Sequence, residues 1–216
     1  YEPYARKRDS NVINFLEARN IKVETYKDQV IFEKSEVTKN DGTPYTVYTP
    51  YKNKWLEKYT STSTKRIKKE PKWEHLNSTQ FEFPSLESLN LTPSKIKVKP
   101  WNISKIESYD EHRNFPESNA TSALGPHLRF GTISIRKLAK EASKRNQTFL
   151  SQLIWREFFM QILWHFPEST DQNFKVKYNG IQWRNNPEEF KKWCNGQTGY
   201  PIVDAGMREL NQTGYM

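Results

Sequence analysis

The sequence has only one cysteine, Cys194, among its 216 residues. A single cysteine excludes an internal disulfide framework and favours a reducing compartment, so we expect a cytoplasmic protein. Long apolar runs are also missing: Arg156 and Glu157 interrupt the longest one, which excludes a membrane-spanning helix there. The first ten residues, YEPYARKRDS, lack the apolar core of a signal peptide, and no internal repeat or metal-binding cluster stands out.

Positive charge and aromatic rings are abundant instead. The formal net charge is +9, and seven tryptophans accompany the tyrosines and phenylalanines. A basic protein favours a polyanionic partner, nucleic acid first, and aromatic faces can stack on bases or on a flat cofactor. Because basic residues also serve solubility alone, the charge by itself leaves both interpretations open.

Residues 149–166, FLSQLIWREFFMQILWHF, form the longest apolar segment; they contain no glycine and a proline follows them directly. The length of the segment and the proline predict a buried helix. On a period of 3.6 residues, Gln152, Trp155, Arg156 and Phe159 share one face. A buried arginine and a buried amide need partners. The helix is therefore either a core helix whose Arg156 meets a carboxylate, or a ligand face on which Trp155 is a stacking platform.

Residues 1–59 are typical of the end of an α/β domain, because capping, β-branched and turn residues succeed one another there. One helix and a few short strands are too little for an independent domain of this class. The elements expected are a helix capped by Asp9 or Ser10 that ends near Asn20, strands over 21–26 and 29–34, a turn at Asp41-Gly42, an extended segment over 43–51 and a helix over 52–59.

Residues 60–108 are predicted to be an interdomain connector, because prolines interrupt them and no periodicity is present. A basic run within them is either solvated or in contact with DNA, and residues 81–91 could form a short ordered loop or helix. The run consists of Lys65, Arg66, Lys68, Lys69 and Lys72.

Residues 109–216 are expected to be mainly helical. Besides the central segment, we predict a helical turn closed by Gly131, a helix capped by Ser134, a helix with Asn186 as cap and Pro187 in its first turn, and a last helix that ends at Gly214. Phe190 and Trp193 are expected on the inner face of the helix that follows Pro187.

Three motifs in the second half carry a resemblance to a known family. They are YDEHRNFP followed by TSALGPHLRFG (109–131), QLIWREFF (152–159), and IQWRNNP followed by WCNGQTGYPIVDAGMR (181–208). They resemble the photolyase/cryptochrome flavoproteins, in the manner of bacterial class I DNA photolyases. YEPYARKRD and TPYKNKW resemble the end of the N-terminal domain of the same family.

The resemblance implies a mainly α fold. Residues 109–216 would be the N-terminal half of a helical FAD-binding domain, and residues 1–59 would be the C-terminal remnant of a Rossmann-like α/β domain. The implied activity is that of a deoxyribodipyrimidine photo-lyase, a carbon–carbon lyase in which light drives an electron from reduced FAD to a pyrimidine dimer. UV-damaged DNA would be the partner, and the protein would be a monomer. The resemblance also implies a second, antenna chromophore, folate or deazaflavin, although the acidic folate contact of the family falls on Ala5 here.

The resemblance also assigns roles to single residues. The pyrophosphate turn Thr-Ser-x-Leu-Ser of the family is Thr121 to Gly125 here, so the glycine removes one hydroxyl but keeps the N–H, and hydroxyls and free N–H groups at a helix start suit an anion. The cofactor contacts implied are Tyr109, Thr121, Ser122, Ala123, Leu124, Gly125, Phe149, Gln152 and Arg156. The DNA and lesion contacts implied are Arg113, Gln152, Trp155 and Phe159. Trp183 matches the outer tryptophan through which electrons reach the flavin.

Two features leave alternatives open. Gln152 occupies a place where enzymes that repair cyclobutane dimers usually carry glutamate, and glutamine is familiar there in (6-4) photolyases and cryptochromes. The sequence also stops at Gly214-Tyr215-Met216, where the family continues, so we expect a fragment that is inactive alone. The alternatives to a photolyase are a cryptochrome-type light receptor with little repair and a basic DNA-binding module that has lost FAD.

Overall fold

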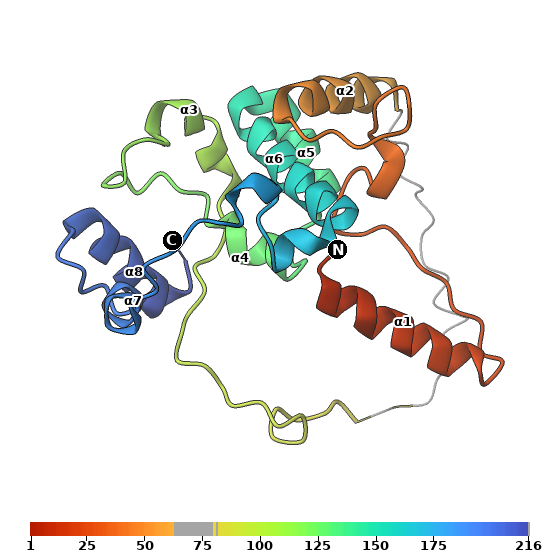
Figure 1. Cartoon of the computed structure of the whole chain (residues 1–216), viewed down its shortest axis with the longest axis horizontal. Helices are drawn as coiled ribbons and strands as arrows, with labels where there is room; N and C mark the ends of the chain where they lie inside the picture. The colour runs from red at the N-terminus through yellow and green to blue at the C-terminus, as the bar shows by residue number, and fades with distance from the viewer. Residues whose placement is uncertain (63–79, 81, 216) are drawn as a thin grey trace.

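The structure is a computed structural model that describes residues 1–62, 80 and 82–215 (Figure 1). Its helices are α1 (Pro3–Glu17), α2 (Tyr48–Ser61), α3 (Tyr109–His112), α4 (Leu124–Arg129), α5 (Ile135–Arg145), α6 (Gln147–His165), α7 (Pro187–Cys194) and α8 (Pro201–Thr213). Short 3₁₀ turns lie between them: η1 (Lys34–Glu36), η3 (Ile103–Ile106), η4 (Pro167–Thr170) and η5 (Val176–Tyr178).

Helix α6 is the central element, as its sequence predicts. It begins where the Asn146 side chain accepts a hydrogen bond from the backbone N–H of Phe149 at 2.9 Å, and Pro167 follows its last turn. Helices α5 and α2 pack against it (Figure 1). Of the described helices, none is both long and apolar enough to cross a membrane.

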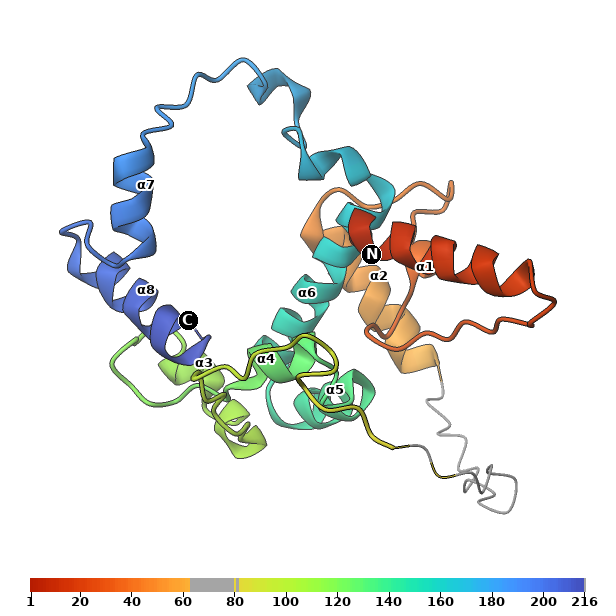
Figure 2. The same cartoon turned by 90° about the horizontal axis from the view of Figure 1, so that it is seen from below.

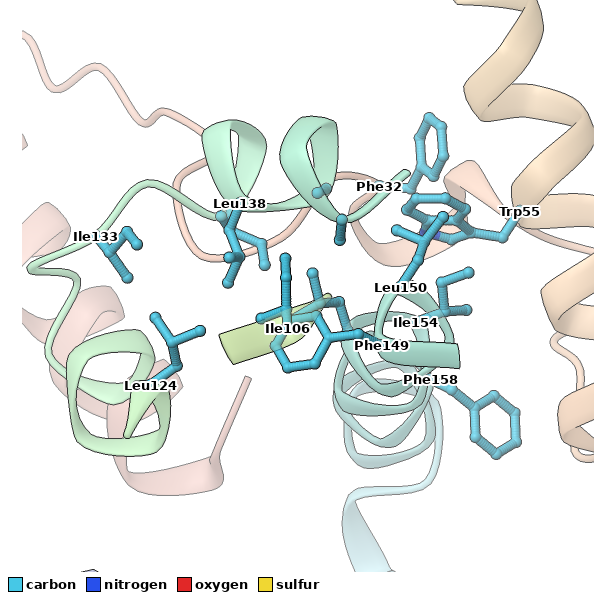
Figure 3. Packing of buried hydrophobic residues seen from close by; sticks show 14 of the residues in the cluster. Phe32, Trp55, Ile106, Leu124, Ile133, Leu138, Phe149, Leu150, Ile154 and Phe158 are labelled. Atoms are coloured by element: carbon cyan, nitrogen blue, oxygen red, sulfur yellow. The ribbon is translucent and has the colours of Figure 1, made fainter. Parts of the chain in front are cut away.

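The hydrophobic core surrounds α6 and draws on residues from both the first segment and the helical part of the chain (Figure 3). Trp55 from α2 is 1% exposed, and Leu138 from α5 and Ile154 from α6 are fully buried. Phe32 packs its ring edge-on to Trp55, with 5.4 Å between the ring centroids. Residues from 1–59 and from 109–216 therefore share one core, which fixes the first segment against α6.

The two predicted strands, 21–26 and 29–34, are wrong: no strand occurs in residues 1–62, 80 or 82–215. A strand requires a neighbouring backbone for its ladder of hydrogen bonds. Here the N–H groups of Ile31 and Phe32 donate to the carboxylate of Glu157 on α6, at 2.7 and 3.0 Å. A side chain of α6 thus takes the hydrogen bonds that a partner strand would take. The fold of the described residues is mainly helical.

Two helix starts also differ from the prediction. Helix α1 begins at Pro3 rather than after Asp9 or Ser10, because proline is favoured at the first helical position and fixes the required φ. Helix α2 begins at Tyr48 rather than at residue 52. Pro50 is its third residue, where a missing N–H costs no intrahelical hydrogen bond.

Several end signals are confirmed. The side chain of Ser134 accepts from the backbone of Lys137 at the start of α5, and Asn186 accepts from Glu188 and Glu189 before α7. Gly214 ends α8 in the left-handed conformation, with φ of 69°. These signals are local in sequence, and each pairs a side chain or a glycine with the nearest backbone groups.

Phe190 and Trp193 do not lie on an inner face, in contrast to the prediction. They are 63% and 43% exposed and stack on each other, with ring centroids 5.7 Å apart. Helix α8 is the described element that packs on α7, and both helices stand away from α1 and α2 (Figure 2). The two rings therefore cover each other rather than a core.

The connector joins these parts without regular structure in residues 82–102. Its basic run (65, 66, 68, 69 and 72) lies outside the described residues. Close to α8, Lys99 forms an ion pair with Glu209 at 3.1 Å, and the side chain of Ile96 lies against Gly214. The boundaries 1–59, 60–108 and 109–216 stay a prediction.

Candidate functional site

A cavity of about 240 Å³ lies beside α6, between α3, α4 and Tyr215, the second residue beyond α8. Its walls are partly polar and partly apolar. The lining residues are Tyr109, Thr121, Ser122, Leu124, Gly125, Leu128, Phe149, Gln152, Leu153, Arg156 and Tyr215. Eight of the residues that the sequence assigns to a cofactor or lesion therefore line a single cavity.

The turn Thr121 to Gly125 forms one wall. Ala123 takes the left-handed conformation, with φ of 54° and ψ of 27°, and turns the chain into α4. Ala123 itself is buried behind the wall, so of the five residues of the turn it alone does not line the cavity. Among the described residues no side chain caps α4. The hydroxyls of Thr121 and Ser122 and the first N–H groups of the helix are therefore available to a ligand.

Tyr109 and Phe149 form the neighbouring wall, where α3 meets the start of α6. Their rings pack edge to face, with centroids 5.1 Å apart and planes at 85°. The Asn146 side chain secures this junction, because its amide donates to the carboxylate of Asp110 at 2.6 Å and to the carbonyl of Glu107 at 3.1 Å. The α6 cap thus also positions α3 at the cavity.

Arg156 is the one charged side chain among the described residues that line the cavity. Its guanidinium donates to the backbone carbonyls of Gln29 at 2.7 Å and Leu128 at 3.4 Å. Both partners of Arg156 are backbone carbonyls, so it does not meet a carboxylate as the core interpretation expected. Burial lowers the pKa of Arg156, yet an arginine keeps its proton, so the cavity carries a positive charge.

Glu157, the next residue on α6, points away from the cavity into the core and is 2% exposed. Its carboxylate accepts from the N–H groups of Ile31 and Phe32, from the indole of Trp55 at 2.7 Å and from the hydroxyl of Tyr51 at 3.5 Å. Burial raises the pKa of Glu157 to about 7, although these hydrogen bonds oppose that rise. Arg156 and Glu157 together tie residues 29–32 to α6.

Trp155 lies on the α2 side of α6, and neither Trp155 nor the neighbouring Phe159 lines the cavity. Tyr48 stacks on Trp155 with ring centroids 3.5 Å apart and planes 8° from parallel. Phe159 also stacks on Trp155, with centroids 5.4 Å apart, and is 61% exposed. The three rings form a stacked group next to the Gln152 edge of the cavity.

Two further predicted residues lie outside the cavity. Arg113 is exposed, and its guanidinium carbon lies 5.4 Å from the centre of the Tyr109 ring, on the outer side of that wall. Trp183 is 66% exposed and lines a separate open hollow with Asp171, Asn173 and other polar residues of the loop before α7. The structure does not bring Trp183 together with the other residues.

Sequence reasoning missed three lining residues, Leu128, Leu153 and Tyr215, and the carboxylate of Glu157 that fixes the first segment to α6. Tyr215 reaches the cavity because the path of α8 brings the end of the chain close to α4. Its ring lies 3.8 Å from the position that a Cβ of residue 125 would take. Nothing in its local sequence signals that contact. Glu157 had a signal, since a charge inside an apolar helix demands partners.

The lining suits a ligand that has both a flat ring and an anionic part. Leucine and aromatic side chains offer an apolar surface, and the Arg156 guanidinium, the hydroxyls of Thr121 and Ser122 and the free N–H groups at the start of α4 line the same cavity. The cavity is slightly smaller than the roughly 300–1,000 Å³ of typical ligand sites, so it holds part of a dinucleotide rather than all of it. The residues present fit FAD in character.

Models of known protein families match both the beginning and the end of the chain. A family described as "FAD binding domain of DNA photolyase" matches residues 149–216, and one described as "DNA photolyase" matches residues 1–72. Deoxyribodipyrimidine photo-lyases of Synechococcus and of Halobacterium salinarum are 32% and 31% identical over the whole chain. The chain spans about half the length of these relatives, 51% and 50%.

The similarity extends to solved structures. A class III photolyase from the bacterium Agrobacterium tumefaciens has a TM-score of 0.77 at 28% identity, and an archaeal photolyase from Sulfolobus tokodaii, solved with two FAD molecules, has a TM-score of 0.65 at 25% identity. Each match covers the whole of this chain and half of the solved one, 50% and 49%. Together with the motifs at 109–131, 152–159 and 181–208, these matches show that the chain belongs to the photolyase/cryptochrome family.

Proposed function

We propose that the chain serves light-driven repair of UV-damaged DNA as part of a photolyase. One observation carries this proposal: a single cavity gathers Tyr109, the Thr121–Gly125 turn, Gln152 and Arg156 beside the stacked rings of Trp155 and Phe159. A site for a flat anionic cofactor thus lies next to a surface on which a flipped-out base can stack. The domain boundaries and the cytoplasmic location belong to the same proposal.

We propose that FAD is the cofactor and that bound FAD supplies the light-excited electron for the dimer. Thr121, Ser122 and the N–H groups that begin α4 would hold its pyrophosphate, with the hydroxyl of Tyr109 as a further donor. Arg156, with Phe149 and Gln152 beside it, would lie against the flavin, and Gln29 and Leu128 fix the direction of the guanidinium. Arg113 would contact a DNA phosphate, and Trp183 would pass electrons from solvent.

Gln152 supports a second candidate function. Its amide can donate or accept a hydrogen bond, but it cannot supply a carboxyl proton or a fixed negative charge to the dimer carbonyls. This property fits a (6-4) photolyase, and it also fits a cryptochrome-type receptor with little repair. The proposal includes an antenna chromophore but does not choose between folate and deazaflavin, because Ala5 in α1 offers no acidic contact to a folate.

The deciding experiment is light-dependent repair of purified lesions by the protein expressed from its natural gene, for wild type and Gln152→Glu at matched flavin content. If the protein repairs cyclobutane dimers, we expect Gln152→Glu to raise the quantum yield; if it repairs (6-4) products, we expect the variant to lower it. Wild-type protein that binds FAD but repairs neither lesion would favour the cryptochrome. An unchanged yield on both lesions would show that Gln152 plays no part in specificity.

A second prediction tests the pyrophosphate site through Gly125. A Cβ at this position would lie 3.8 Å from the Tyr215 ring, an ordinary contact, and residue 125 does not need the left-handed conformation. Gly125→Ser should therefore fold normally and add one hydroxyl to the anion site. We expect FAD to bind roughly two- to tenfold more tightly, as one added hydrogen bond would give.

The control is Gly125→Ala, which adds the same Cβ without the hydroxyl. Titration of the flavin fluorescence against protein measures all three dissociation constants. If the alanine and serine variants bind FAD equally well, the turn does not hold the pyrophosphate through side-chain hydroxyls.

A further inference from the structure

Tyr48 is the first residue of α2, yet its strongest contacts are with α6. Its ring lies parallel to Trp155 at a centroid distance of 3.5 Å, and its hydroxyl donates to the backbone carbonyl of Ser151 at 2.8 Å. In an α-helix that carbonyl also accepts from the N–H of the residue four positions later, which is Trp155. Tyr48 therefore contacts both the ring of Trp155 and the carbonyl that holds its backbone.

The position of Ser151 shows which face of Trp155 is covered. At about 100° per residue, Trp155 lies about 40° from Ser151 and about 100° from the cavity residue Arg156. Phe159 lies on the same side of Trp155 as Arg156, about 40° further round the helix. Tyr48 thus occupies the face of the indole that looks toward α2 and away from the cavity.

The rear of Trp155 is closed to any ligand. Rings 3.5 Å apart are in van der Waals contact, so no base fits between Tyr48 and Trp155. The edge of Phe158 meets both rings, with centroids 5.9 Å from Tyr48 and 5.7 Å from Trp155. Behind them Tyr51 of α2 is 1% exposed. A base can reach Trp155 only from the opposite face, on the side of Gln152. The exposed Phe159 already stacks on the indole there, with centroids 5.4 Å apart, so the base must share that face with the Phe159 ring or displace it.

We propose that Tyr48 is a positioning residue for damaged DNA: its ring backs Trp155 and holds the indole so that the face toward Gln152 and Phe159 receives the flipped-out base. The inference rests on the proposed function, since it concerns the stacking surface of the lesion. It adds a residue from the first segment of the chain to a site otherwise built from α6. It also commits the lesion to one of the two faces of Trp155.

The test measures, by fluorescence anisotropy with the protein expressed from its natural gene, the binding of oligonucleotides of one sequence that are undamaged or carry a central cyclobutane dimer or (6-4) product. The lesion that wild type prefers is the dimer used for the variants. Tyr48→Leu removes the flat ring but keeps an apolar side chain. We expect it to weaken binding of the dimer oligonucleotide about 5- to 20-fold, a part of the full effect of losing a stacking partner. Binding of the undamaged oligonucleotide, held through phosphates, should stay within about twofold.

Two further variants separate positioning from general stability. Tyr48→Phe keeps the stack and loses only the hydrogen bond to Ser151, so it should retain most of the preference for the dimer. Tyr59→Leu is the matched control, because Tyr59 also lies on α2 and stacks on a tryptophan, Trp55, with centroids 4.7 Å apart. Its loss should lower stability but leave the preference for the dimer unchanged.

Each alternative result overturns the inference in its own way. Equal weakening on both oligonucleotides would mean that Tyr48 only stabilises the fold. Tighter binding of the dimer by Tyr48→Leu would mean that Tyr48 occupies the place of the base. If wild-type protein prefers neither the cyclobutane dimer nor the (6-4) product over undamaged DNA, the proposed function fails, whereas a wild-type preference that survives in Tyr48→Leu removes only the role of Tyr48.

Discussion

Replacement of Glu157 by alanine is expected to lower the free energy of unfolding by about 3–5 kcal/mol, the range seen when one partner of a buried charged network is removed. The carboxylate receives the N–H groups of Ile31 and Phe32 and the indole N–H of Trp55. All three donors are buried or nearly so, and each unsatisfied donor costs about 1–3 kcal/mol. Chemical denaturation measures the effect as a shift of the midpoint at constant slope.

Glu141→Ala on α5 is the matched control. Glu141 is a partly exposed glutamate that pairs with Arg145 at 3.3 Å one turn later, and exposed pairs of this kind contribute little to stability. A loss of stability by Glu157→Ala no larger than that of Glu141→Ala would contradict the structure. Solvent or a neighbouring group would then satisfy the amides of residues 31 and 32.

The pH dependence of stability tests the same residue independently. Burial raises the pKa of Glu157 to about 7, above the roughly 4.3 of an unfolded glutamate. The folded state therefore binds this proton more tightly, so the contribution of Glu157 is fully present below about pH 4 and is lost as pH rises to about 7. Glu157→Gln should lack this loss. The stability of wild type relative to Glu157→Gln should fall between about pH 5 and 7 by roughly 1.4 kcal/mol per unit at most.

Other groups near Glu157 keep their charge state over that range. Tyr1 and Tyr51 face the carboxylate with raised pKa values, and Arg156 stays protonated, so none of them titrates between pH 5 and 7. The histidines are present in both proteins and cancel in the difference. A relative stability that rises with pH would show that the three hydrogen bonds outweigh burial and keep the carboxylate ionised.

The sequence predicted those parts of the fold whose signals are local. The Ser134 cap, the Asn186-Pro187 start of α7 and the Gly214 end of α8 each involve backbone groups within four residues. The apolar length of α6 predicts a central helix for the same reason. Periodicity and capping describe what a segment can satisfy by itself, so these predictions agree with the structure.

The wrong predictions depend on distant partners. Residues 29–34 have the composition of a strand, yet their N–H groups meet a carboxylate 125 positions or more away in the chain. Phe190 and Trp193 have the spacing of an inner face, but the element that packs on α7 in the described structure is α8, and both rings stay exposed. A local sequence pattern cannot predict either contact, because each depends on which distant element packs against the segment.

The cavity was predictable only in part. The resemblance supplied Tyr109, the Thr121–Gly125 turn, Gln152 and Arg156, and the structure places them around one space. It did not supply Tyr215, which depends on the path of α8, or Tyr48, which depends on the packing of α2 against α6. The assigned chemistry of these residues stays a prediction until the lesion and flavin experiments are done.

Trp155→Leu is expected to weaken binding of dimer-containing DNA by about 1–3 kcal/mol, or roughly fivefold to 150-fold, because one base loses its stacking partner. Leucine keeps apolar contact with Tyr48 and Phe158 but offers no flat face. Undamaged DNA is held mainly through phosphates, so its affinity and its salt dependence should stay nearly unchanged. Anisotropy titrations at several salt concentrations measure both quantities.

The matched control is Trp164→Leu, another partly buried tryptophan of α6, near its C-terminal end. Its ring packs against Tyr1 with centroids 5.9 Å apart and lies 4.2 Å from the guanidinium of Arg6, away from Gln152. Its loss should affect stability but not the ratio of the two DNA affinities. Because Trp155 also packs against the core, Trp155→Leu can cost stability as well. Only the ratio of affinities for damaged and undamaged DNA therefore decides its role, and a ratio that matches wild type would place Trp155 in the core alone.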